Sequence, residues 1–311
     1  MKRVFIILIF IFSCSPERVD VPDPINVIDS TDPVIPVEYG LQEYEIEFDG
    51  LLRSFNIYVP ESYDPSTPVP MLFCFHGYGS NNQVIMNYTE FNDIADQDNF
   101  IVVYPQGTFL NGITHWNVGG WTVGSFVDDV AFVDFLIENL SANYSINAER
   151  IYSTGMSNGG YMSFLLACEL SNKIAAIASV TGSMTPQTFY SCQPQRAISI
   201  LQMHGTSDGV VPYSGNQAWT MGINTVVNYW RSHNSCSTGP VLIDIPDIYT
   251  FDNSTVQEIT YSNGNNNTMV RHYKVNGGGH DWFGAWGNRD IIASEIIWEF
   301  FSMYDINGLI N

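Results

Sequence analysis

Short apolar runs alternate with helical patterns along most of the chain. From Glu43, apolar residues at every second position flank an Asp-Gly pair at 49–50, which predicts a β-hairpin. Later apolar runs are continuous, as in buried strands, and most are followed by a helix-like pattern. We expect strands at 70–77, 101–107, 150–155, 174–182 and 197–205, helices near 83–97, 127–143, 158–170, 217–233 and 289–303, and a hairpin around 256–276.

This order of elements predicts the fold class. Continuous apolar strands that alternate with helices form a mostly parallel central sheet with helices on both faces, so the chain is expected to be α/β. No internal repeat and no domain boundary is found within residues 43–311, which we interpret as one domain.

The first residues predict export. In residues 1–14 two basic residues precede an apolar run that is too short for a permanent membrane span, and Cys14 follows a small residue. This pattern resembles a lipoprotein signal in which Cys14 is lipidated after cleavage, and plain secretion is the alternative. Residues 15–42, rich in proline and acidic residues, are expected to form an extended tether before the domain at 43–311.

Charge limits the partners. The 311 residues include 32 acidic and 11 basic residues, a net charge of −21. Such a chain repels nucleic acid phosphates and has no basic patch for anionic lipids. We therefore expect no nucleic acid partner, and membrane contact only through a lipid anchor. The other four cysteines, Cys74, Cys168, Cys192 and Cys236, could form disulfides in an oxidising compartment, in any of about three full pairings.

The segment GMSNG places Ser157 between Gly155 and Gly159, after an expected strand and before an expected helix. This is the context of a nucleophile elbow, in which a strained bend exposes a serine hydroxyl and glycines are needed to avoid collisions. A glycine-rich turn without chemistry is the alternative interpretation.

A serine nucleophile needs a base and an orienting carboxylate. His280 lies in the glycine-rich segment NGGGHDWFG, and Asp208 follows the strand at 197–205, at the sheet edge where Ser157 is expected. His272, inside a strand, and His233, at a helix end, are weaker candidates. The sequence therefore predicts a triad of Ser157, Asp208 and His280.

The backbone N–H groups of Tyr78 and Asn158 are the predicted oxyanion donors. His76 and His204 each precede a glycine at a strand end and are interpreted as structural. The sequence contains no metal-ligand spacing and no dinucleotide- or phosphate-binding glycine motif, so no metal and no cofactor is expected. The expected chemistry is acyl transfer to Ser157, then hydrolysis by water.

With these motifs the chain resembles the secreted esterases that join polyhydroxybutyrate depolymerases to feruloyl and acetylxylan esterases, within the α/β-hydrolase fold. The resemblance runs from about Tyr44 to Phe301 and rests on HGYGSN, IVVYPQG, DDVAF, GMSNGGYMSFLLACEL, HGTSDGVVPYSG and GGGHDWFGAW. It implies the triad and oxyanion hole given above, carboxylic ester hydrolysis, and a Cys168–Cys192 disulfide. The chain departs from the family at residues 281–283, where Asp-Trp-Phe replaces the usual Thr-Trp-Pro.

Four tryptophans are expected in loops around the site, where they could stack on sugars and phenolic acids or pack in the core: Trp116, Trp121, Trp282 and Trp286. The leading hypothesis is an exported serine esterase that removes feruloyl or acetyl groups from polysaccharide-derived esters. The alternatives are a polyhydroxyalkanoate depolymerase and a catalytically inactive glycan-binding lipoprotein. The oligomeric state is left open.

Overall fold

A computed structural model describes residues 26–28 and 38–310. Its centre is an 11-stranded sheet in the order β1-β2-β3-β5-β4-β8-β9-β10-β13-β12-β11. The strands are β1 (Asn26–Ile28), β2 (Gly40–Phe48), β3 (Leu51–Val59), β4 (Val69–Phe75), β5 (Ile101–Pro105), β8 (Ile146–Met156), β9 (Ala176–Val180), β10 (Ser199–Gly205), β11 (Thr238–Asp244), β12 (Thr255–Ser262) and β13 (Val270–Asn276).

The middle of the sheet is parallel. Strands β5, β4, β8, β9, β10 and β13 all pair in parallel, so their carboxyl ends lie at one edge. The β2–β3 hairpin pairs antiparallel at one side, and β12 and β11 pair antiparallel at the other. The central strands β4, β5, β9 and β10 are buried at every position, as their continuous apolar sequences predict.

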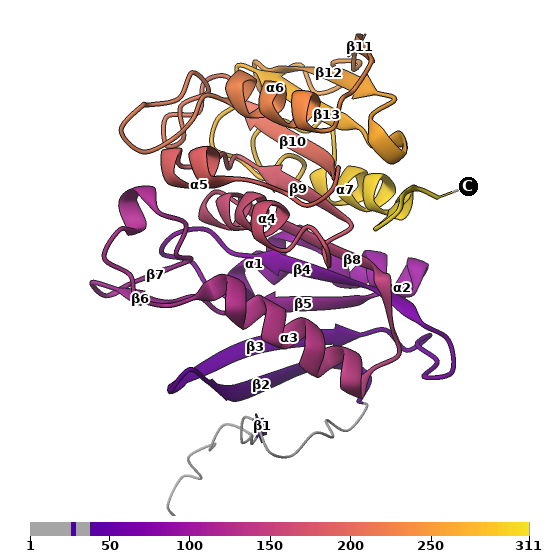
Figure 1. The fold of residues 1–311 in the computed structure, drawn as a ribbon. Helices are drawn as coiled ribbons and strands as arrows, with labels where there is room; N and C mark the ends of the chain where they lie inside the picture. Colours follow the sequence, from indigo (N-terminus) through magenta and orange to yellow (C-terminus); the bar gives the residue numbers. More distant parts are fainter. Residues whose placement is uncertain (1–25, 29–37, 311) are drawn as a thin grey trace, which may run out of the picture.

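Helices cover both faces of the sheet (Figure 1). One face packs against α3 (Asp129–Asn143), α4 (Asn158–Glu169) and α6 (Ile223–His233), and the other against α1 (Asn82–Thr89), α2 (Phe91–Asp98) and α7 (Ala293–Ser302). Each face has its own cluster of buried apolar side chains. The predicted fold class, a mostly parallel α/β sheet of the α/β-hydrolase type, is confirmed.

Two expected helices differ from the structure. The helix expected near 83–97 is two helices, because Glu90 has φ 53° and ends α1 in the left-handed region. The helix expected from 217 begins at Ile223, because residues 214–222 form turns in which Gly215, with φ +79°, approaches Gly222. Elements that the sequence pattern did not predict are β6 (Thr108–Leu110), β7 (Ile113–His115), α5 (Pro186–Ser191), β11, β14 (Tyr304–Asp305) and β15 (Gly308–Leu309).

Part of the predicted tether belongs to the sheet. The three residues of β1 pair in parallel with Tyr44–Ile46 of β2, and the domain's first long strand begins at Gly40. The predicted signal at 1–14, with its lipidation site Cys14, lies outside the described residues. Within the described part of the chain, no helix has the length and apolar character to cross a bilayer.

The cysteine pairing implied by the resemblance is present. Cys168, near the end of α4, is bonded to Cys192, directly after α5, with Cα atoms 5.0 Å apart. Cys74 is a buried thiol whose pKa is raised by that burial, and Cys236 is a half-buried thiol. The disulfide therefore ties a short surface helix to the helix that follows the candidate nucleophile.

One edge of the sheet is exposed. All seven residues of β11 are exposed, and Val241, Leu242 and Ile243 show 47%, 56% and 50% of their surface. Among the described strands, β11 pairs only with β12.

Candidate active site

Ser157 lies at the bend between β8 and α4. Its backbone has φ 54° and ψ −120°, a conformation that L-residues rarely adopt, and its N–H donates to Val180 O at 2.9 Å. A Cβ at Gly155 would lie 2.5 Å from the Phe75 carbonyl oxygen, and one at Gly159 only 2.0 Å from it. The two glycines of the motif are therefore required by close backbone packing, as the sequence predicts.

Asp208 and His280 are joined at the same edge. His280 Nδ1 lies 2.8 Å from Asp208 Oδ2, and Asp208 Oδ1 accepts hydrogen bonds from the N–H groups of Val210 and Val211, both at 2.8 Å. Burial by itself would raise the pKa of Asp208, but hydrogen bonds from His204, His280 and the Val211 N–H hold it well below its usual range. Asp208 is therefore an ionised carboxylate that can orient the His280 ring.

Backbone contacts fix the loops that carry these two residues. The Ser207 N–H donates to Gly278 O and the Thr206 N–H donates to Val275 O, both at 2.9 Å. A Cβ at Gly205 would lie 2.2 Å from Gly278 O. The glycines before His280 thus allow its loop to lie directly on the loop of Asp208.

Ser157 shares a cavity with the Asp208 loop. The cavity measures about 390 Å³, and its lining is apolar. It is lined by Tyr78, Gly120, Trp121, Ser157, Val210, Val211 and Trp219. Within the described residues the Ser157 hydroxyl makes no hydrogen bond to His280. Such contacts often tighten only when substrate binds.

The predicted oxyanion donors have no competing acceptors. Among the described residues, neither the Tyr78 N–H nor the Asn158 N–H donates to another group. Asn158 is the first residue of α4, where the helix dipole favours negative charge. Its buried side chain pairs with the main chain of Trp116, accepting from the N–H at 2.7 Å and donating to the carbonyl at 3.1 Å. No local pattern in the chain indicated this contact.

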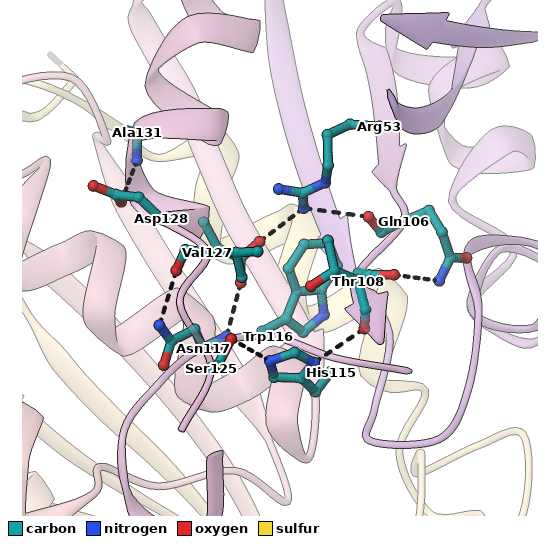
Figure 2. Close-up of polar contacts among 12 residues, drawn as sticks. Arg53, Gln106, Thr108, His115, Trp116, Asn117, Ser125, Val127, Asp128 and Ala131 are labelled. Atoms are coloured by element: carbon teal, nitrogen blue, oxygen red, sulfur yellow. Dashed lines mark hydrogen bonds and ion pairs between the residues drawn. The ribbon is translucent and has the colours of Figure 1, made fainter. Parts of the chain in front are cut away.

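A buried ion pair anchors the segment between β7 and α3 (Figure 2). Arg53 of β3 contacts Asp129 at 2.7 Å, and the second oxygen of Asp129 accepts from the Asn117 N–H at 2.7 Å. The Arg53 guanidinium also lies 3.9 Å from the centre of the Phe132 ring. Removing one partner of such a pair commonly costs about 3–5 kcal/mol, because the other charge stays buried. This pair therefore holds the loop that supplies Trp116 and Trp121.

The predicted aromatic contacts divide into three cases. Trp121 lines the cavity, with its ring perpendicular to that of Trp219 at a centroid distance of 5.4 Å. The predictions for Trp116 and Trp282 are wrong, because these rings are 0% and 1% exposed and pack in the core. Trp286 is half-buried against Tyr88 and does not line the cavity.

The sequence prediction missed Trp219, Val210 and Val211. Val210 and Val211 directly follow Asp208 within HGTSDGVVPYSG, so their position in that motif was the available signal. Trp219 lies in a stretch where a helix was expected, and a loop aromatic is hard to recognise there.

The other histidines support the backbone. His76 Nδ1 contacts Gly77 O at 2.8 Å while Nε2 accepts from the Gly107 N–H at 2.9 Å. His272 Nδ1 contacts Gln202 O at 3.0 Å, and its Nε2 lies 2.8 Å from the Tyr213 hydroxyl. Burial lowers the pKa of His76 and of His272 to about 4. No group of three or more His, Cys, Asp or Glu residues in the described chain is arranged to hold a metal ion.

Most of the chain matches a known protein family. The model of the Esterase family matches residues 51–289, which includes all three predicted triad residues. The chain belongs to the Esterase family. This family membership agrees with the resemblance found from the motifs.

Two curated relatives illustrate the family. The esterase is 26% identical over 268 residues to the bifunctional acetylxylan esterase/xylanase XynS20E of Neocallimastix patriciarum, covering 86% of this chain and 36% of the relative. It is 29% identical over 181 residues to feruloyl esterase D of Neurospora crassa, covering 55% of this chain and 58% of the relative. The esterase thus spans less than two thirds of either relative's length.

Solved structures share the fold. An acetyl xylan esterase from Aspergillus awamori matches with a TM-score of 0.60 at 13% identity, covering 80% of this esterase and 94% of that chain. A ferulic acid esterase from Anaeromyces mucronatus, solved with ferulic acid, matches with a TM-score of 0.52 at 15% identity, covering 86% and 92% of the two chains. At these identities the likeness supports the fold alone.

Two buried histidines should make the free energy of unfolding depend on pH. His76 and His272 have folded pKa values of about 4, whereas an unfolded histidine titrates near 6.5. As pH falls through about 6.5, the unfolded chain binds protons that the native state excludes, so the free energy of unfolding decreases. This stability is fully present above about pH 6.5 and is lost toward pH 4, with a slope of up to about 2.7 kcal/mol per pH unit for two groups.

Urea unfolding at about pH 7.5, 6.5 and 5.5 measures this slope. His272→Gln should make it shallower, because one of the two protons no longer takes part. A slope unchanged by that substitution would contradict the assignment.

Proposed function

We propose that this protein is a serine esterase that works through an acyl-enzyme, with Ser157 as nucleophile, His280 as general base and Asp208 as the orienting acid. The observation that carries the proposal is the 2.8 Å contact between His280 and Asp208 at the edge where the strained bend presents Ser157. The ionised carboxylate holds the Nδ1–H tautomer of His280, which leaves Nε2 to accept a proton.

The proposed reaction has two halves. His280 Nε2 takes the proton of Ser157 while the serine oxygen bonds to the ester carbonyl carbon, and the oxyanion accepts hydrogen bonds from the N–H groups of Tyr78 and Asn158. The carbon–oxygen bond to the alcohol then breaks, and the alkoxide takes the proton from His280. Water then attacks the carbonyl carbon of the acyl-enzyme, and His280 takes the proton of the water and passes it to Ser157. This step releases the carboxylic acid and restores Ser157.

The cavity beside Ser157 supports an aromatic acyl group of the hydroxycinnamoyl type. Two perpendicular indole rings, Trp121 and Trp219, form part of an apolar space of about 390 Å³. An acetyl group would leave most of this space unfilled, whereas a phenolic ring buries enough apolar surface to gain affinity. The names of the curated relatives, feruloyl and acetylxylan esterases, support an ester of this class on a polysaccharide.

Export belongs to the same proposal. The signal at 1–14 with lipidation at Cys14 would place the enzyme outside the cytoplasm, where polysaccharide esters occur. The Cys168–Cys192 disulfide supports an oxidising compartment.

The nucleophile is tested by Ser157→Ala. We expect the purified variant to lose hydrolysis of both methyl ferulate and p-nitrophenyl acetate, leaving residual catalysis of about 10³- to 10⁴-fold over water. A fluorophosphonate probe should label the wild-type protein and not the variant. Failure to label the wild type would favour the alternative of an inactive glycan-binding protein, and an unchanged rate in the variant would rule out this nucleophile.

The acyl preference is tested by Trp219→Ala. We expect kcat/KM for methyl ferulate to fall about 10- to 100-fold, because the ring contact is lost, while kcat/KM for the acetate ester changes less than about threefold. Tyr190→Ala, at a residue 77% exposed on α5, is the matched control and should change neither. Equal losses on both esters would contradict an aromatic acyl pocket, and clearing of a polyhydroxybutyrate emulsion would favour the polyester alternative.

A further inference from the structure

A second hollow lies beside the predicted oxyanion donor. It measures about 580 Å³ and, in the described chain, has no charged residue in its lining. Its lining comes from the loop after β4, from Gln106 directly after β5 and from the β6–β7 hairpin: Gly79, Ser80, Asn81, Gln106, Phe109, Gly112, Ile113 and Thr114. We call it the hairpin groove. Its first residue, Gly79, follows Tyr78 of the cavity lining, so cavity and groove are neighbours along the chain.

The groove is fixed relative to the active site. The Gly79 N–H donates to Thr114 O at 2.8 Å, and the Thr114 hydroxyl donates to Ser80 O at 2.5 Å. The hairpin turns through Asn111 and Gly112, both with positive φ. Its position is thus set by the loop that carries the oxyanion donor, which preorganises any ligand in the groove toward Ser157.

The lining has the chemistry of a neutral sugar site. Phe109 is 73% exposed and offers an aromatic surface, with Ile113 41% exposed beside it. Within the described residues the Ser80 hydroxyl and the Asn81 amide nitrogen have no hydrogen-bond partner, so both can bind ligand hydroxyls. A uronic acid would find no cation in this lining, and the net charge of −21 opposes acidic chains.

We propose that the hairpin groove binds neutral sugar units of the polysaccharide chain that carries the ester, with Phe109 as the stacking residue. This inference deepens the proposed function and rests on it. The acyl group would enter the apolar cavity, and the sugar chain would continue past Tyr78 into the groove.

Phe109→Ala tests the groove with two ferulate esters. We expect KM for a feruloylated neutral arabinoxylo-oligosaccharide to rise about tenfold, because a stacking contact is lost, with KM for methyl ferulate unchanged. Phe251→Ala, at a residue 86% exposed on the loop after β11, is the control and should leave both values unchanged. An equal effect of Phe109→Ala on both esters, or no effect on either, would overturn the proposal.

A binding measurement separates this inference from the esterase reaction. Calorimetry of the Ser157→Ala variant with the unesterified neutral oligosaccharide should detect binding that Phe109→Ala weakens. If the wild-type protein hydrolyses no ester, the proposed function is wrong. If the oligosaccharide does not bind, or if Phe109→Ala does not weaken its binding, the groove proposal is wrong.

A different observation concerns His204, which is fully buried behind Asp208. Gln202 Nε2 lies 3.0 Å from Gly182 O, which identifies it as the donor end of the amide, and 3.1 Å from His204 Nδ1. His204 Nδ1 therefore accepts, and the proton sits on Nε2. That nitrogen lies 2.9 Å from Val211 O and 3.3 Å from Asp208 Oδ2.

We infer that His204 is a positioning residue for the acid of the triad. Its Nε2 bonds to Val211 O and lies 3.3 Å from Asp208 Oδ2, while the Val211 N–H donates to the other oxygen of Asp208. His204 thus restrains both ends of the turn from 208 to 211, and so fixes the carboxylate that orients His280. This inference too rests on the proposed triad.

His204→Leu and His204→Gln test this role. We expect kcat for methyl ferulate to fall about 10- to 100-fold in His204→Leu with KM within twofold, because the acid loses its orientation. His204→Gln, which keeps an N–H near the position of Nε2, should recover most of kcat. His233→Leu, at a histidine bonded to Arg196 O, is the control and should keep full activity.

A double-mutant cycle distinguishes positioning from a general loss of stability. In an Asp208→Asn background, His204→Leu should reduce kcat little further, because the restrained carboxylate is already gone. If His204→Leu fails to fold, His204→Asn takes its place in the cycle. Additive losses in the cycle, or a His204→Gln variant as impaired as the apolar one, would overturn the inference.

Discussion

The site depends on the contact between the backbone of Gly159 and the carbonyl of Phe75. No side chain fits between them, so the start of α4 lies against the end of β4. The same approach brings two predicted oxyanion donors together, because Asn158 precedes Gly159 and Tyr78 follows Phe75 by three residues. The strained backbone of Ser157 is thereby held by the surrounding sheet rather than by its own preference. Packing at one strand end thus sets the geometry of the predicted nucleophile and of both predicted donors.

Buried polar contacts, together with apolar packing, position the loops around this bend. One oxygen of Asp129 accepts from the Arg53 guanidinium and the other accepts from the Asn117 N–H. A single carboxylate thus joins β3, α3 and the loop before α3. Asn158 performs a similar role for Trp116. Each contact satisfies groups that would be costly to leave unpaired. The loops can therefore be long and irregular while the indole rings at the cavity keep fixed positions.

The sequence was sufficient for the parts of the molecule that obey local rules. Buried parallel strands were recognisable from continuous apolar runs, and the glycines on either side of Ser157 indicated close backbone contacts that the structure contains. Trp116 and Trp282 were misassigned because a loop tryptophan has the same sequence signal whether its ring faces the core or a ligand. The break at Glu90 was not predicted, because nothing in a glutamate residue indicates a left-handed backbone. The partners of Asp129 and Asn158 are distant in the chain, so no local pattern revealed them.

The open side of the sheet affects how the protein behaves in concentrated solution. Among the described residues, one side of β11 has no strand partner, and three consecutive aliphatic side chains are exposed, so this edge can act as a template for pairing between molecules. Repulsion between chains that each carry a charge of −21 opposes this at low ionic strength. Added salt shortens the reach of that repulsion to about 8–10 Å, so colloidal solubility should fall as ionic strength rises.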